Sequence, residues 1–335
     1  MKKIRIGDCT IGSKKTFVIA EIGSNHDGSM RQAKALIAAA RDSGSDAVKF
    51  QSFKAENLVV PGHAAFKKLR QLELPLSWHR ELKRYADRQR ILFFSTAFDE
   101  ERALLLNSIG VPAFKISSGD LTFKPLIQRI ARFKKPILLS TGMATIPEIE
   151  AAIRLITALK NDRIVLLHCV SNYPTEFKDA NLKALMTLRR RFHLPVGLSD
   201  HSLGISVPLA AVSLGAAVIE KHFTLSRKLT GPDHGFALEP DELKEMIARI
   251  RAIEQALGDG KKIPRRSEIP ERKWARRGIY AQEVISKGSV ITKDRLAFLR
   301  PFHGLSPSAI DSILGGRTKV TIKKGMPVTI SQIQK

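Results

Sequence analysis

The chain has 335 residues, 43% of them hydrophobic, so it can form one large domain with a smaller one beside it. Two cysteines, Cys9 and Cys169, are too few for a disulfide framework, and no apolar run is long enough for a secretory signal or a membrane span, so we expect a cytoplasmic protein with no membrane association. The net charge of +24 fits a solvated surface, the focusing of anionic substrates or nucleic-acid binding, but no basic stretch is interleaved with aromatic residues, and we expect no nucleic-acid partner.

Short apolar runs alternate with longer amphipathic segments as far as Gly258. The runs are rich in Val, Ile and Phe and nearly continuous in apolarity, which is typical of parallel strands buried on both faces. They begin at Phe17, Ala47, Ile91, Ala113, Pro136, Ile164, Val196 and Ala217. Eight such units over about 250 residues predict a (β/α)8 TIM barrel. A doubly wound sheet is the alternative, but the first turn, EIGSNHDG, is not the GxGxxG of that fold.

The intervening segments carry helix signals. Ala33, Leu36, Ile37 and Ala40 have helical spacing, Thr145 is a plausible N-cap before IPEIEAAIRLITALK, and Gly258 is a natural C-cap for the last helix.

The sequence divides into four parts by composition. We expect an N-terminal β-hairpin cap over 1–16, the catalytic TIM barrel over 17–258, a charged and Pro-rich linker over 259–276, and a small mainly-β domain over 277–335.

Polar residues follow every predicted strand at the point where it ends, and in a TIM barrel these ends form the active-site face. Lys49 and Lys115 lie within apolar runs, and a buried Lys needs an anionic partner to keep its proton. Two inward lysines with several hydroxyl groups predict a phosphate or carboxylate site. The other strand-end residues include Glu21, Gln51, Thr96, Ser118, Asp120, Ser140, Tyr173, Ser199, Asp200 and Glu220.

His201 and His222 end neighbouring predicted strands, each beside a carboxylate. Two imidazoles with nearby carboxylates suit a divalent cation that polarises a substrate oxygen. The alternative is that both histidines orient loops.

The motifs IAEIGSNH, DAVKFQ, FKISSGD, STGM, YPT, GLSDHSLG and EKHFT…GPDH occur in order, and together they resemble the sialic acid synthase family of the bacterial N-acetylneuraminate synthase type. The tail KGSVITKDRLAFLRPFHGLSP resembles that family's C-terminal antifreeze-like (SAF) domain. The resemblance covers essentially the whole chain.

The resemblance implies an enzyme that condenses phosphoenolpyruvate with an N-acetylated amino sugar, N-acetylmannosamine in the main interpretation, and releases phosphate. It implies that Mn²⁺ or Mg²⁺ is held by His201 and His222, and that Glu21, Lys115 and Asp120 are catalytic, although the position of Asp120 is often Glu in the family. The implied phosphoenolpyruvate contacts are Lys49, Thr96, Lys115, Ser118, Ser140 and Ser199, and the implied sugar contacts are Glu21, Tyr173, Asp233 and Arg300.

The resemblance also implies a domain-swapped homodimer in which Arg300 reaches the partner's sugar site. Alternative acceptors are the diacetamido-trideoxyhexoses that lead to legionaminate or pseudaminate. The KISSGD motif is closer to the neuraminate and legionaminate members of the family than to the pseudaminate type. A 6-phosphorylated amino sugar is a further alternative for the acceptor. More remote alternatives are an aldolase that forms a Schiff base on Lys49 or Lys115, and a basic nucleic-acid-binding protein.

Overall fold

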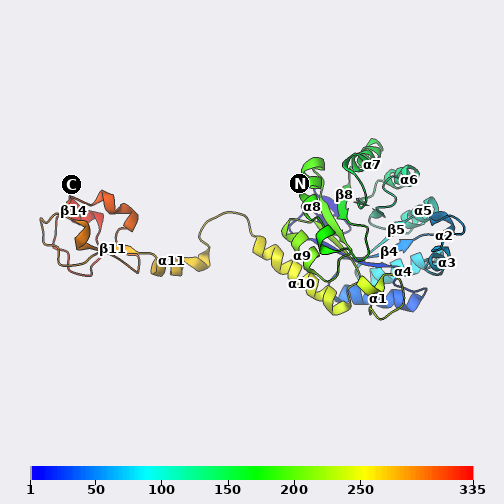
Figure 1. Cartoon of the computed structure of the whole chain (residues 1–335), viewed down its shortest axis with the longest axis horizontal. Coiled ribbons are helices and arrows are strands. Elements are labelled where there is room, and N and C mark those ends of the chain that lie inside the picture. The colour runs from blue at the N-terminus through cyan, green and yellow to red at the C-terminus, as the bar shows by residue number, and fades with distance from the viewer. Residues whose placement is uncertain (1, 335) are drawn as a thin grey trace. The chain divides into compact units, whose positions relative to one another are not determined.

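The computed structural model of the chain describes residues 2–334, which form two compact units that divide between Gly258 and Asp259 (Figure 1). None of the helices within residues 2–334 is both long and apolar enough to cross a membrane.

The first unit contains a closed eight-stranded parallel barrel, which confirms the predicted TIM-barrel fold. The strand order β10-β3-β4-β5-β6-β7-β8-β9 follows the chain around the barrel. The strands are β3 (Phe17–Gly23), β4 (Ala47–Ser52), β5 (Leu92–Ala97), β6 (Phe114–Ile116), β7 (Ile137–Ser140), β8 (Ile164–Cys169), β9 (Val196–Asp200) and β10 (Val218–His222).

A helix follows each barrel strand and packs its apolar face onto the outside of the barrel. These helices are α1 (Met30–Asp42), α4 (Leu76–Arg88), α5 (Glu100–Ser108), α6 (Lys124–Arg132), α7 (Ile146–Ala158), α8 (Lys183–Phe192), α9 (Ser206–Ser213) and α10 (Pro240–Leu257). Two short helices, α2 (Ala55–Leu58) and α3 (Phe66–Gln71), precede α4. The expected signals hold: α1 buries Ala33, Leu36, Ile37 and Ala40, Thr145 caps α7, and α10 ends at Gly258.

Strand register decides which side chains face the barrel interior. Ser199 of β9 is paired with Glu220 of β10, and Asp200 with Lys221. Successive side chains of a strand point to opposite faces. Ser199 and Glu220 therefore share the inner face, while Asp200 and Lys221 share the outer face.

A two-stranded hairpin, β1 (Ile4–Ile6) and β2 (Cys9–Ile11), covers the N-terminal ends of the barrel strands. Its Ile4, Ile6 and Ile11 are buried against interior residues from several strands, including Phe17 and Phe94. This apolar plug closes one end, so the polar interior opens only at the other.

The second unit is a small β domain with its own apolar core. Antiparallel pairs join β11 (Gly278–Ala281) to β12 (Leu296–Leu299), and β13 (Arg317–Thr318) to β14 (Ile333–Gln334). The 259–276 segment, predicted as a linker, contains the helix α11 (Ile269–Ala275), because Pro270 in its first turn is pre-organised for a helix start.

We expect the free energy of unfolding to fall between pH 6.5 and 4. His79 of α4 is fully buried, its ring nitrogens lie 2.6 Å from Ser52 Oγ and 3.0 Å from the Pro75 carbonyl, and burial lowers its pKa to about 4. As pH falls, the unfolded chain therefore takes up a proton first, which removes about 3 kcal/mol of stability by pH 4. Denaturant unfolding measured at several pH values in this range gives the free energy of unfolding at each pH. That free energy should fall less steeply with decreasing pH in His79→Gln than in the wild type, and an equally steep fall would contradict the argument.

Candidate active site

A polar cavity of about 420 Å³ opens at the C-terminal ends of the barrel strands. It is lined from every strand of the barrel, and most of its walls are side chains that can hydrogen bond. Ten of the thirteen site residues that the resemblance implies line it: Glu21, Lys49, Thr96, Lys115, Ser118, Tyr173, Ser140, Ser199, His201 and His222. The remaining lining residues include Gln51, Ser117, Cys169, Ser171 and Glu220.

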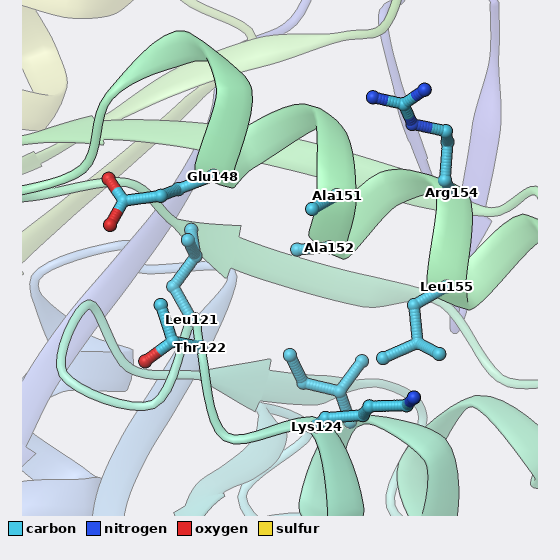
Figure 2. Close-up of a pocket in the computed structure, with 9 residues that line it drawn as sticks. Leu121, Thr122, Lys124, Glu148, Ala151, Ala152, Arg154 and Leu155 are labelled. Carbon is cyan, nitrogen blue, oxygen red and sulfur yellow. The ribbon is translucent and has the colours of Figure 1, made fainter.

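A second cavity, of about 580 Å³, lies between α6 and α7 on the outside of the barrel (Figure 2). Its floor is apolar, with Leu121, Ala152 and Leu155, and its charged residues stand apart from one another on its borders in Figure 2. Glu148 there is held by the Thr145 backbone N–H as the cap of α7. This cavity is larger but has no convergent polar groups, so we assign the chemistry to the rim of the barrel.

Two lysines and two glutamates form the floor of the polar cavity. Lys49 Nζ lies 2.8 Å from Glu21 Oε2, and Lys115 Nζ lies 3.2 Å from Glu220 Oε1. Burial alone would lower the pKa of Lys49, but the Glu21 and Glu220 carboxylates outweigh it and raise that pKa. Lys49 is therefore a charged ammonium, which is the form that binds anions. Schiff-base formation needs the neutral amine instead.

Glu220 was expected at the end of a strand, but the resemblance assigns it no role in the site. Its carboxylate lies between the two lysines, since Oε2 is 3.9 Å from Lys49 Nζ, and its Oε1 accepts a hydrogen bond from Ser199 Oγ at 2.8 Å. Burial would raise the pKa of Glu220, but Lys115 and Lys49 hold it at about 2. Burial instead raises the pKa of Glu21 in spite of Lys49. The two carboxylates thus differ in proton affinity although they share one ammonium.

Hydroxyl groups surround the lysines. Thr96 Oγ1 accepts a hydrogen bond from Lys49 Nζ at 3.0 Å, and Ser118 Oγ accepts one from the Gly142 backbone N–H at 3.0 Å. Ser140 Oγ is buried and has no hydrogen-bond partner within residues 2–334. A buried hydroxyl in that state is suited to a ligand oxygen.

Gly142→Ala should weaken the binding of a substrate at these hydroxyl groups. A Cβ at this position would lie 2.5 Å from Ser171 Oγ and 2.8 Å from Ser118 Oγ, so both hydroxyls must shift. Overpacking of this kind costs about 1–3 kcal/mol, and we expect the KM for the substrate bound at these hydroxyl groups to rise roughly tenfold. Gly235→Ala is the steric control, because no atom lies within 4 Å of a Cβ there. Equal KM values in both variants would refute the prediction.

His201 and His222 face one another across the cavity, with ring centroids 5.3 Å apart. Burial lowers the pKa of both rings, which keeps them in the neutral form that binds metals. His201 Nδ1 lies 2.9 Å from the Val170 carbonyl, an arrangement that directs Nε2 away from that contact, and His222 Nδ1 is buried without a hydrogen-bond partner in the described part of the chain.

This pair fits a cation with open coordination positions better than a closed structural site. No group of three or more His, Cys, Asp or Glu residues within 2–334 is arranged to hold a metal ion. Asp200, expected near the metal, instead lies 2.5 Å from Lys221 Nζ on the outer face of the barrel. The two imidazoles would thus be the protein's ligands, and substrate or water would complete the coordination.

Comparison with known proteins agrees with this geometry. Residues 36–262 match the NeuB family, and residues 276–334 match the SAF domain. The chain belongs to the NeuB family of sialic acid synthases. It is therefore a sugar-acid synthase of the transferase class, with a TIM barrel followed by a SAF domain.

Three similar proteins are synthases named for different sugar acids. It is 42% identical to N,N'-diacetyllegionaminic acid synthase of Legionella pneumophila, over 96% of each chain. It is 37% identical to pseudaminic acid synthase of Campylobacter jejuni, over 93% of this chain and 95% of that one. The crystal structure of N-acetylneuraminic acid synthetase from Leptospira borgpetersenii is 38% identical, with a TM-score of 0.77, and covers 81% of this chain and 95% of that one.

Tyr173 and Asp233 lie on the side of the synthase cavity where the two histidines are. The Tyr173 ring centroid is 4.2 Å from that of His201. Asp233 does not line the cavity, but its Oδ2 is 3.8 Å from His222 Nδ1, and burial raises its pKa. Phe236, which the predicted set lacks, packs on His222 with centroids 4.9 Å apart.

Besides Asp233, two more of the predicted residues do not line the cavity. Asp120 does not line the cavity, but Ser117 does. Asp120 Oδ2 accepts a hydrogen bond of 2.6 Å from Ser117 Oγ. Any action of Asp120 on water would therefore pass through Ser117 or need a rotamer change. Arg300 belongs to the second unit, where its guanidinium lies over the Trp274 ring, and its sugar contact stays a prediction.

Proposed function

We propose that the synthase condenses phosphoenolpyruvate with the open-chain aldehyde of an N-acetylated amino sugar, to give a nine-carbon 2-keto-3-deoxy sugar acid and phosphate. The observation that carries the proposal is the pair of buried lysine side chains, Lys49 and Lys115, in a cavity ringed by hydroxyls. The lysine and hydroxyl groups of this lining can donate hydrogen bonds to the phosphate and carboxylate oxygens of phosphoenolpyruvate.

The chemistry balances without an added redox partner. C3 of phosphoenolpyruvate forms the new bond to the aldehyde carbon, whose oxygen takes a proton and becomes a hydroxyl. Water adds to C2 and gives up a proton, and the tetrahedral intermediate collapses to the ketone as the C–O bond to phosphate breaks. Lys49 and Lys115 neutralise the phosphate and carboxylate charges, and Glu21, whose raised pKa favours proton exchange, lies beside the reacting groups.

We propose that His201 and His222 hold a Mn²⁺ or Mg²⁺ ion. When bound, this ion would supply Lewis-acid polarisation of the aldehyde oxygen. The unpartnered His222 Nδ1 and the neutral state of both rings support the assignment.

The relatives favour a diacetamido-trideoxyhexose as acceptor over N-acetylmannosamine, the main expectation from the sequence. The legionaminic acid synthase is 42% identical over nearly the whole chain, above the 38% of the N-acetylneuraminic acid synthetase. We therefore propose legionaminate-type synthesis.

An acceptor panel tests this proposal. Phosphate release from phosphoenolpyruvate with Mn²⁺ should require an acceptor, and should have a higher kcat/KM with 2,4-diacetamido-2,4,6-trideoxymannose than with N-acetylmannosamine. A preference for N-acetylmannosamine would overturn the acceptor assignment, and no acceptor-dependent phosphate from folded protein would overturn the reaction.

The dimer and the Arg300 contact belong to the same proposal. Sedimentation of the full chain tests for the dimer, and Arg300→Met tests the contact through a raised acceptor KM.

A further inference from the structure

The loop over 223–239, which follows β10, forms one wall around His222. It carries Asp233, whose Oδ2 is 3.8 Å from His222 Nδ1, and Phe236, whose ring packs on His222 and lies 5.7 Å from Tyr173 between centroids. No residue of this loop lines the cavity, but Asp233 and Phe236 contact His222 and Tyr173, which do line it, so the position of the loop bears on where those two side chains lie.

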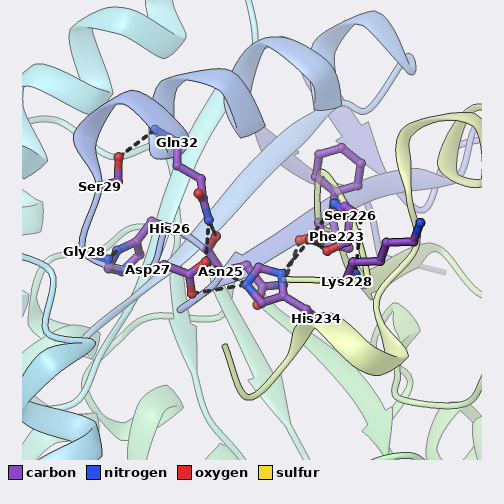
Figure 3. A network of polar contacts seen from close by, with 11 residues as sticks. Asn25, His26, Asp27, Gly28, Ser29, Gln32, Phe223, Ser226, Lys228 and His234 are labelled. Atoms are coloured by element: carbon purple, nitrogen blue, oxygen red, sulfur yellow. Dashed lines mark hydrogen bonds and ion pairs between the residues drawn. The ribbon is translucent and has the colours of Figure 1, made fainter. Parts of the chain in front are cut away.

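His234 lies between Asp233 and Phe236 in the sequence, is fully buried and does not line the cavity. Its Nε2 lies 2.9 Å and 3.1 Å from the two carboxylate oxygens of Asp27, and its Nδ1 lies 2.6 Å from Thr224 Oγ1 (Figure 3). His234 thus links Asp27, in the loop between β3 and α1, to both ends of the 223–239 loop. The catalytic chemistry proposed above uses none of these three residues.

The Asp27 side of the network is itself held by α1. Gln32 Nε2 donates hydrogen bonds to Asp27 Oδ2 at 2.6 Å and to the Asn25 carbonyl at 2.7 Å. Asn25 Nδ2 in turn donates to the Phe223 carbonyl at 3.0 Å, as Figure 3 shows. The two loops are therefore tied at two points, and the anchor is a helix that packs on the barrel.

Gly231 shows how closely the network is packed. A Cβ at this position would lie 2.5 Å from Asp27 Oδ1 and 2.8 Å from the His234 ring. No other residue fits without parting the Asp27–His234 pair, so the backbone of the loop is built around that contact.

We propose that His234, Asp27 and Thr224 are positioning residues that hold Asp233 and Phe236 against His222, and so set the affinity for the amino-sugar acceptor but not for phosphoenolpyruvate. The phosphoenolpyruvate side is independent of the network, because Lys49 and Lys115 lie on barrel strands outside it. The acceptor part of this inference rests on the proposed function, whereas the tether between the loops does not.

Two measurements on the full chain test the inference, with Thr230→Ala, an exposed site in the same loop, as control. In His234→Ala the KM for the acceptor should rise at least about tenfold, with the KM for phosphoenolpyruvate within about twofold, since a small misplacement of a positioning group has effects of this size. Trypsin should also cut at the exposed Arg227 and Lys228 at least about fivefold faster, with other sites unchanged.

Two further variants separate positioning from folding. His234→Gln, which can still donate to Asp27, should recover part of both effects, and Asp27→Asn combined with His234→Ala should be no worse than His234→Ala alone. Equal changes in both KM values, or accelerated cleavage at all sites together, would overturn the inference. If wild type releases no phosphate the proposed function fails, and the cleavage pattern still decides whether the tether exists.

Discussion

Lys49→Met should lower kcat/KM for phosphoenolpyruvate by roughly 30- to 4,000-fold, because loss of one partner of a buried charge pair costs roughly 2–5 kcal/mol and each 1.4 kcal/mol is a factor of ten. Lys49 Nζ contacts Glu21, Thr96 and, at 3.9 Å, Glu220, so the substitution removes the central positive charge of the cavity floor. It also leaves Glu21 with Gln51 Nε2, 3.1 Å away, as its remaining hydrogen-bond donor.

Steady-state phosphate release, with circular dichroism to show that the variant is folded, measures this effect. Lys54→Met is the matched control, because Lys54 is exposed just beyond β4 and the substitution makes the same change of charge and size. Lys49→Arg should give an intermediate value, since it keeps the charge but not the geometry. A folded Lys49→Met variant with wild-type kcat/KM would remove the basis for placing the anion there.

His222→Ala should lower kcat by roughly 1,000-fold and weaken Mn²⁺ binding, because Lewis-acid polarisation of a carbonyl is worth several kcal/mol. His222 is one of only two imidazoles that line the cavity within residues 2–334, and its Nδ1 has no hydrogen-bond partner there. Titration of Mn²⁺ by electron paramagnetic resonance separates lost binding from lost chemistry.

The control for this variant is His193→Asn. His193 is exposed at the end of α8 with φ 54°, a conformation that Asn tolerates, so folding should be unaffected. If His222→Ala binds Mn²⁺ as tightly as wild type, the two histidines orient loops instead, which is the alternative that the sequence left open.

The barrel and most of its active-site face could be predicted because local sequence determines them. Buried parallel strands need continuous apolar runs, so Lys49 and Lys115 stood out within theirs, and both line the cavity. The partner of each lysine could not be assigned in the same way, because Glu220 reaches them only after the barrel closes β10 onto β3.

Asp200 was misplaced although the sequence held the necessary signal. Side chains alternate along a strand, so if Ser199 and His201 face the interior, Asp200 faces out, and Lys221 next to Glu220 and His222 does the same. The two residues form a buried ion pair behind the site. The partner of His234, by contrast, could not be predicted from the sequence. The GPDH motif can be recognised, but Asp27 is 207 residues away in the chain and no local pattern connects the two residues.

Phosphoenolpyruvate labelled with ¹⁸O in its bridging oxygen gives the most direct test of the reaction at this site. We expect mass spectrometry to find the label in phosphate and a nine-carbon 2-keto acid that contains the acceptor sugar, both absent in Lys49→Met. Unlabelled phosphate would mean that the P–O bond is cleaved, and pyruvate formed without incorporation of the sugar would mean that the cavity does not join the two substrates; either result would contradict the account.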